Sequence, residues 1–173
     1  MKDEIRSKFP EGVPFPPGLE LLCDWHKHNG YPISGGFELR ADNGYISSWF
    51  GSSAANDRIA MFGAGSDGSL YCIWDDGEGH FPVVHLGSEG DALKILAGDF
   101  YDFLRLLAVG YDELGFDDLC DSPSSEEGIN PEFRSWVQGQ LSLEIPDHGR
   151  NIFREANEVC PDFQAWVNSI PIS

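Results

Sequence analysis

Short apolar runs separated by turn residues dominate the middle of the chain. Three of them are rich in β-branched and aromatic residues and cover residues 59–62, 70–74 and 82–86. Clusters of Gly, Asp and Ser lie between them. These residues favour tight turns, because glycine accepts positive φ and the side chains of Asp and Ser cap the backbone. A fourth apolar run follows at residues 92–96. The pattern predicts an antiparallel strand meander.

The apolar spacing changes to a helical period directly after this meander. The positions i, i+3, i+4 and i+7 are occupied by Phe100, Phe103, Leu104 and Leu107. Asp99 stands before this run and Gly110 follows it, and both residue types are typical of helix ends. We therefore predict a helix over residues 99–110.

The first thirty residues predict an extended arm followed by a helix. Four prolines among residues 1–18 favour extended backbone, so this part should lie on the surface as an arm without a helix. An apolar face begins at Leu19 and the pair Asn29-Gly30 is a suitable helix stop. This spacing predicts a helix over residues 19–29.

The next segment carries a strong hairpin signal. Asn43-Gly44 is the two-residue turn that most favours a tight β-hairpin. It lies between two runs with apolar and aromatic residues, at 37–42 and 45–50. We expect these runs to pair as two antiparallel strands and to extend the meander.

A nine-residue pattern occurs twice in the C-terminal part. It reads INPEFRSWV at residues 129–137 and VCPDFQAWV at residues 159–167. In both copies a proline and an acid suit a helix N-terminus, and Phe, Trp and Val form one apolar stripe. The pattern predicts two docking helices with Trp136 and Trp166 largely buried. The preceding residues 112–127 include seven acids and should form an exposed connection or a short helix.

These elements predict one α+β domain spanning residues 1–173. Its centre would be a twisted, mainly antiparallel sheet of about six strands flanked by helices. The arm of residues 1–18 would precede a core of residues 19–114, and residues 128–173 would form a C-terminal helical extension. A chain of 173 residues is of ordinary single-domain size and can bury about two thirds of its unfolded surface.

Three segments of the meander and its helix share a pattern with a known family. They read Phe-Gly-x-x-x-Asp-Gly-Ser-Leu-Tyr-x-x-Trp at residues 62–74, Pro-Val-Val-x-Leu-Gly-Ser-Glu-Gly at 82–90 and Asp-Phe-x-x-Phe-Leu-x-Leu-Leu at 99–107. With these segments the chain resembles the SUKH superfamily. The resemblance begins near Pro17, continues past Leu114 and includes the repeated C-terminal pattern, so it covers roughly four fifths of the chain.

The resemblance implies both a fold and a function. The superfamily contains fungal cell-wall regulators and many bacterial immunity proteins. Bacterial members are encoded beside polymorphic toxins and neutralise them by direct binding, and many of these toxins are basic nucleases. The resemblance therefore implies a SUKH-like fold and a protein-binding function, but it assigns no contact residues.

The distribution of charge along the chain disfavours some classes of partner and favours others. The net charge is −18, and between Arg58 and Arg134 there are 16 acidic residues against two basic ones, which is −14. Nucleic acid is excluded as a partner, because phosphate backbones require clustered Lys and Arg. A basic protein would be attracted, although the same acidity can serve solubility alone. The 41% of hydrophobic residues argues against a disordered acidic tail.

Several patterns resemble chemical sites but lack the context that those sites need. The G-x-G-x-x-G at residues 63–68 is followed by a strand rather than a helix, so it indicates a hairpin turn and no nucleotide site. Cys23, His26 and His28 form a thiol-imidazole cluster without a second ligand pair, which favours a core cysteine and two ordinary histidines. We predict no cofactor, no metal site and no catalytic set.

The expected function is therefore that of a non-enzymatic, protein-binding module, in the first place an immunity protein that neutralises a cognate toxin by charge-complementary binding. The alternatives are a regulatory or scaffold protein with another partner and, more remotely, a hydrolase that uses hairpin carboxylates with His80 or His85. Charge and expected exposure select six candidate binding residues: Asp75, Asp76, Glu78, Asp117, Asp118 and Asp121. We expect a cytoplasmic protein, because the N-terminus lacks an apolar leader and no run is long enough for a membrane helix.

Overall fold

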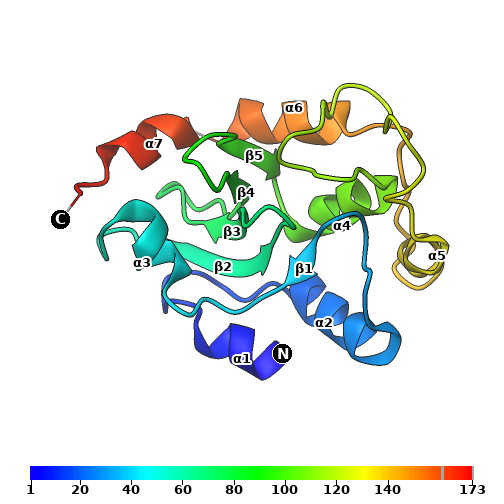
Figure 1. Cartoon of the computed structure of the whole chain (residues 1–173), viewed down its shortest axis with the longest axis horizontal. Coiled ribbons are helices and arrows are strands. Elements are labelled where there is room, and N and C mark those ends of the chain that lie inside the picture. Colours follow the sequence, from blue (N-terminus) through cyan, green and yellow to red (C-terminus); the bar gives the residue numbers. More distant parts are fainter. Residues whose placement is uncertain (161, 173) are drawn as a thin grey trace.

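The computed structural model describes residues 1–160 and 162–172, and it shows an α+β fold built on an antiparallel sheet (Figure 1). The strands are β1 (Glu38–Leu39), β2 (Ile59–Ala64), β3 (Leu70–Trp74), β4 (Val83–Leu86) and β5 (Lys94–Ala97). Their order in the sheet equals their order in the sequence, and each neighbouring pair is antiparallel. The predicted meander is thus confirmed from β2 to β5, but the described residues form five strands and not six.

Helices cover both faces and one edge of this sheet. They are α1 (Lys2–Ser7), α2 (Pro17–Asn29), α3 (Tyr45–Phe50), α4 (Phe100–Val109), α5 (Pro131–Gly139), α6 (Arg150–Val159) and α7 (Phe163–Ser169). In Figure 1, α1 and α2 lie near β1 and β2, whereas α6 lies along β5 at the opposite edge.

Side chains of the strands alternate between two cores. In β3, Tyr71 and Ile73 belong to the core shared with α2, α4 and α5. Leu70, Cys72 and Trp74 belong to the second core, which includes side chains of α3 and α7. All five side chains are buried, and this explains why the strands read as continuous apolar runs instead of alternating with polar residues.

The helix predicted over residues 99–110 is confirmed as α4. The Asp99 side chain accepts a hydrogen bond from the Asp102 amide at 2.9 Å and caps the helix N-terminus. Gly110 ends the helix with φ of 97°, a left-handed conformation that glycine adopts without strain. The helix predicted over residues 19–29 is also confirmed, and α2 begins two residues earlier at Pro17.

The prediction of a hairpin around Asn43-Gly44 is wrong. Residues 45–50 form α3, and β1 retains only two residues of the expected first strand. Asp42 explains the outcome, because its Oδ1 accepts hydrogen bonds from the amides of Gly44 at 2.9 Å and Tyr45 at 2.7 Å. A carboxylate in this position satisfies amides that a helix leaves unpaired at its N-terminus.

The expectation of a helix-free N-terminal arm is also wrong. Residues 2–7 form α1, because the prolines begin only at residue 10 and leave the first turns unrestricted. Ile5 is fully buried and anchors α1 in the core. Lys2 and Arg6 form ion pairs with Glu20 on α2, at 3.4 and 2.8 Å.

The two helices predicted from the repeated pattern are present as α5 and α7. Trp136 is only 9% exposed, as expected. The prediction that Trp166 is largely buried is wrong, because this side chain is only half-buried against Phe50 and Trp74. No sequence pattern predicted α6, whose Asn157 side chain donates to the Ile95 carbonyl of the edge strand β5 at 2.9 Å. This helix covers an edge that would otherwise expose unpaired backbone groups.

Candidate protein-binding surface

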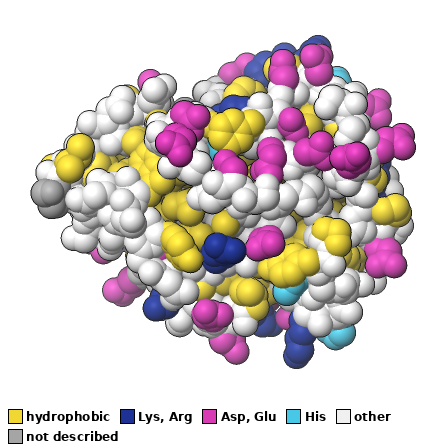
Figure 2. All heavy atoms as spheres, in the orientation of Figure 1, with side chains coloured by type: hydrophobic (Ala, Val, Ile, Leu, Met, Phe, Trp, Pro, Cys, Tyr) yellow, Lys and Arg dark blue, Asp and Glu magenta, His cyan; other side chains and the backbone are white. Residues whose placement is uncertain are grey.

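The connection between α4 and α5, residues 111–129, carries the acidic cluster predicted from the sequence. It contains neither a helix nor a strand, so the expected connection is confirmed. Figure 2 shows many Asp and Glu side chains over this part of the molecule, in the region of the connection seen in Figure 1. We call residues 111–129 the acidic connection.

Buried contacts hold the acidic connection in one conformation. The Tyr111 hydroxyl donates a hydrogen bond to the Asp121 carbonyl at 2.6 Å and accepts one from the Gly149 amide at 3.0 Å. Leu114 and Leu119 are buried in the core on the α4 side of the sheet. The backbone of the connection is therefore preorganised, and a partner would pay little ordering entropy to bind it.

Of the second group of candidate residues, two are clearly exposed. Asp118 is exposed and its Oδ1 accepts from the Cys120 amide at 2.9 Å, while the Asp121 side chain is 77% exposed and lies 3.9 Å from Arg150. Asp117 is half-buried, because its Oδ2 accepts a hydrogen bond from the Glu113 amide at 3.1 Å. All three carboxylates are thus at least partly accessible on the connection.

An exposed aromatic ring lies within this acidic surface. Phe116 is 49% exposed, and it borders a hollow of about 300 Å³ whose wall also includes Phe153 and Lys94. Lys94 is half-buried, and burial lowers the pKa of its amine. Phe116 was not among the residues predicted from charge, which selected only the neighbouring acids. An isolated aromatic between acids in a turn-rich segment is the sequence signal that marks it. Large exposed aromatics are frequent anchors of protein interfaces.

His85 supports this surface from below. It is fully buried, its Nδ1 lies 2.8 Å from the Ala92 carbonyl, and its Nε2 is enclosed without a hydrogen-bond partner among the described residues. The ring packs edge-on against Phe116, and Gly115 approaches so closely that a side chain there would overlap the imidazole. Burial lowers the pKa of His85, so the neutral form is favoured.

The first group of candidate residues, Asp75, Asp76 and Glu78, lies on the turn between β3 and β4. The prediction that Asp76 is exposed is wrong. Asp76 is not exposed: its side chain is 0% accessible. It accepts hydrogen bonds from the amides of Glu78 at 2.7 Å and His80 at 3.1 Å, and His80 Nδ1 lies 2.7 Å from its Oδ2. Asp75 is half-buried, and of the three only Glu78 is exposed. A short turn with several amides pointing inward needs an acceptor, and Asp76 supplies it.

The thiol-imidazole cluster consists of a core cysteine, as predicted, and of histidines on the same helix that are not buried. Cys23 is buried in the core, and burial raises the pKa of its thiol to about 11, which keeps it protonated. His28 is exposed, and its Nδ1 lies 2.8 Å from the Asp24 carbonyl. Within the described ranges, no group of three or more His, Cys, Asp or Glu side chains is placed to hold a metal ion.

The glycine-rich segment of residues 63–68 ends β2 and leads into the turn before β3, so the predicted hairpin turn is confirmed. The Asp67 side chain closes the turn by accepting from the amide and the hydroxyl of Ser69, at 3.1 and 2.7 Å. The residues that follow this turn form β3 and not a helix. A dinucleotide fingerprint requires a helix N-terminus directly after its glycines.

A comparison of the chain with models of protein families, with curated proteins and with solved structures found no match. Among the residues that the structure describes, no helix has the length and apolar character needed to cross a membrane.

Proposed function

We propose that this chain is a protein-binding module whose acidic connection binds a basic protein, and that this partner is a toxin which the chain neutralises. The observation that carries the proposal is the exposed Phe116 ring within a fixed acidic segment. An aromatic anchor within a mainly acidic surface has the composition of an interface core with a polar rim.

The two parts of this surface would act on different steps of binding. Asp118 and Asp121 would attract a basic partner from solution and raise the association rate, because exposed charges act mainly through long-range steering. Phe116 would then be desolvated in the complex and would slow dissociation, because a buried aromatic anchor contributes most of its free energy after docking.

The identity of the partner as a toxin rests on the resemblance to the SUKH superfamily. An acidic inhibitor suits a basic nuclease physically, because an anionic surface can occupy the groove that binds phosphate. The runner-up, a regulatory or scaffold protein, shares the binding surface and differs in the partner. The hydrolase alternative is less favoured, since His85 is enclosed and His80 is held by the buried Asp76.

The test uses the C-terminal domain of the protein encoded immediately upstream as the partner. If that domain stops growth when expressed alone, co-expression of the chain should restore growth. The same domain should bind the purified chain, with an association rate that falls as salt rises. A non-toxic upstream domain, or one that does not bind, overturns the immunity proposal.

Charge reversal then tests the surface. The triple change Asp117→Lys, Asp118→Lys and Asp121→Lys should lower the association rate at least about tenfold at an ionic strength of about 0.01 M, where screening is weak. A matched triple reversal at Asp3, Glu4 and Glu11, three exposed acids near the N-terminus, should change it much less. Equal effects of the two triples would show that net charge acts without a defined surface.

Phe116→Ser separates the anchor from the charges. We expect at least about a tenfold faster dissociation and little change in association. Thermal unfolding of each variant checks that the fold is retained, and an unchanged dissociation rate for a folded Phe116→Ser variant contradicts the proposed anchor.

A further inference from the structure

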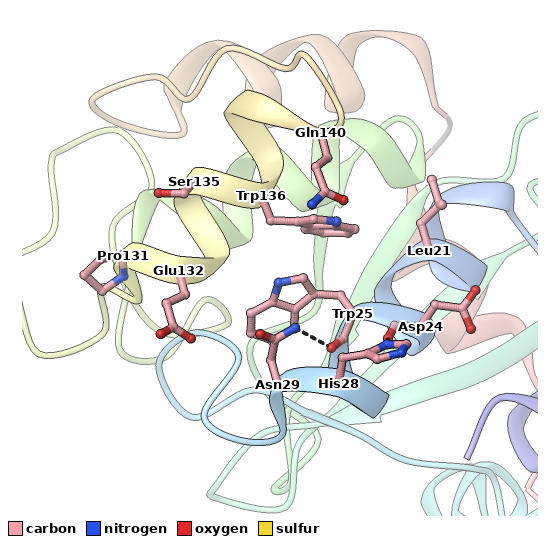
Figure 3. A pocket seen from close by; sticks show the side chains of 10 residues that line it. All are labelled: Leu21, Asp24, Trp25, His28, Asn29, Pro131, Glu132, Ser135, Trp136 and Gln140. Carbon is pink, nitrogen blue, oxygen red and sulfur yellow. Dashed lines mark hydrogen bonds between the residues drawn. The ribbon is translucent and has the colours of Figure 1, made fainter.

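A broad groove lies between α2 and α5, at the end of the acidic connection. It has a volume of about 780 Å³, and Figure 3 shows the side chains that line it. Its inner wall is formed by Trp25 of α2 and Trp136 of α5, whose ring centroids are 6.1 Å apart. The groove begins directly after the connection, because Glu132 belongs to the first turn of α5.

The two indoles are fixed before any ligand binds. Trp25 is 7% exposed and Trp136 is 9% exposed, and both rings pack against Phe133, at centroid distances of 5.2 and 5.6 Å. Both residues line the groove, and Figure 3 shows Trp136 of α5 pointing toward Trp25 of α2. A ligand that stacks there would therefore meet preorganised aromatic surface.

Two carboxylates line the groove, together with the imidazole of His28. Asp24 and Glu132 line it from the two helices, and no Lys or Arg is among its lining residues. Asp24 is paired with Lys2 at 2.8 Å, whereas Glu132 makes no ion pair with the described residues. The negative faces of the indoles add to this field, because an aromatic ring attracts cations to its face.

We infer that this groove binds an arginine side chain of the basic partner, with the guanidinium on the indoles and its N–H groups directed to Glu132. Arginine fits better than lysine, because its planar guanidinium stacks on aromatic rings and still presents donors to a carboxylate. The inference rests on the proposed function for the nature of the partner. It adds a specificity pocket beside the acidic connection.

The test uses two short peptides and the indole signals of the labelled chain. Acetyl-Gly-Arg-Gly-amide carries the cation, and the same peptide with citrulline in place of arginine is a neutral match of nearly equal shape. The indole N–H resonances of Trp25 and Trp136, assigned with Trp25→Phe and Trp136→Phe, should shift saturably with the arginine peptide. The citrulline peptide should shift them several-fold less.

Glu132→Gln should weaken this binding about threefold, as expected for loss of one exposed charge interaction. Glu155→Gln removes an equal charge from an exposed position on α6, outside the groove, and should leave the affinity unchanged. Equal binding of the two peptides, or equal affinities of Glu132→Gln and the unaltered chain, overturns the inference.

The outcomes distinguish this inference from the proposed function. Shifts confined to the backbone amides of residues 112–127 would show that the acidic connection attracts cations and that the groove is no pocket. Conversely, specific indole shifts together with failure of the growth and binding tests would leave the groove as an arginine site and remove the toxin as its source.

Discussion

Replacing Asp76 with alanine should lower the free energy of unfolding much more than replacing its neighbour Asp75. The two carboxylates are adjacent in the sequence and both lie in the turn between β3 and β4. Only Asp76 is enclosed, and it accepts three hydrogen bonds, from the amides of Glu78 and His80 and from the His80 ring. Asp75 Oδ1 accepts one, from the Gly77 amide at 2.9 Å.

The magnitude follows from these bonds. A hydrogen bond to a charged group contributes about 1.5–3 kcal/mol, and a neutral one about 1. The His80 side chain is 41% exposed, so water can replace the hydrogen bond between its ring and the Asp76 carboxylate in the variant. At about 1 kcal/mol for each bond, Asp76→Ala should cost about 3 kcal/mol and Asp75→Ala about 0.5–1 kcal/mol. Asp76→Asn keeps an acceptor without the charge and should fall between them.

The assay is urea unfolding at pH 7, followed by tryptophan fluorescence and circular dichroism. Equal m-values would show that the variants unfold from comparably compact states. A loss for Asp76→Ala no greater than that for Asp75→Ala would refute the reasoning, because it would mean that the enclosed carboxylate does not hold the turn.

The pH dependence provides a second check on Asp76. Burial by itself would raise the pKa of its carboxyl, but the hydrogen bonds from Glu78 and His80 outweigh burial and hold that pKa below its ordinary value. A lowered pKa stabilises the folded state above the unfolded-state pKa, about 3.9, and this stabilisation is lost as pH falls. The difference in the free energy of unfolding between the unaltered chain and Asp76→Ala should therefore become smaller below pH about 4.

Two further predictions concern buried aromatic residues. Burial lowers the pKa of His85, so the unfolded state binds more protons below pH about 6.5 and stability should fall there by at most about 1.4 kcal/mol per pH unit. Burial also lowers the pKa of His26, which adds to the slope of the free energy of unfolding against pH. His85→Gln should make this slope flatter in urea unfolding from pH 5 to 8, and an unchanged slope contradicts the assignment to His85. Trp136→Ala should cost about 3–5 kcal/mol and the half-buried Trp166→Ala distinctly less, measured by the same method. Equal losses would show that exposure does not rank these sites.

Local patterns predicted the elements whose causes lie within a few residues of the chain. The runs of β2 to β5 and their glycine-rich turns, the Asp99 cap and Gly110 stop of α4, and the proline start of α5 were all readable, because turns and caps depend on neighbouring residues. Pro161, the matching proline of the second copy, lies outside the described residues. The concentration of charge in the acidic connection was equally a property of the sequence.

The tertiary structure decided where those local preferences compete. Asn43-Gly44 favours a hairpin in isolation, but Ile46 and Phe50 are buried together in the core beside α7 with residues 45–50 helical. The Asp42 cap then fixes that choice. Propensity is a weak preference, and burial of two large side chains outweighs it.

The candidate sites depended on the tertiary structure to a greater degree. Charge alone could not separate Asp76, which is enclosed by its own turn, from the exposed Asp118. The groove joins Trp25 to Trp136, which are far apart in the sequence and meet only when α5 packs near α2. Exposure and long-range proximity are set by the packing of the whole chain, so sequence determined which side chains were available and the fold determined which of them a partner can reach.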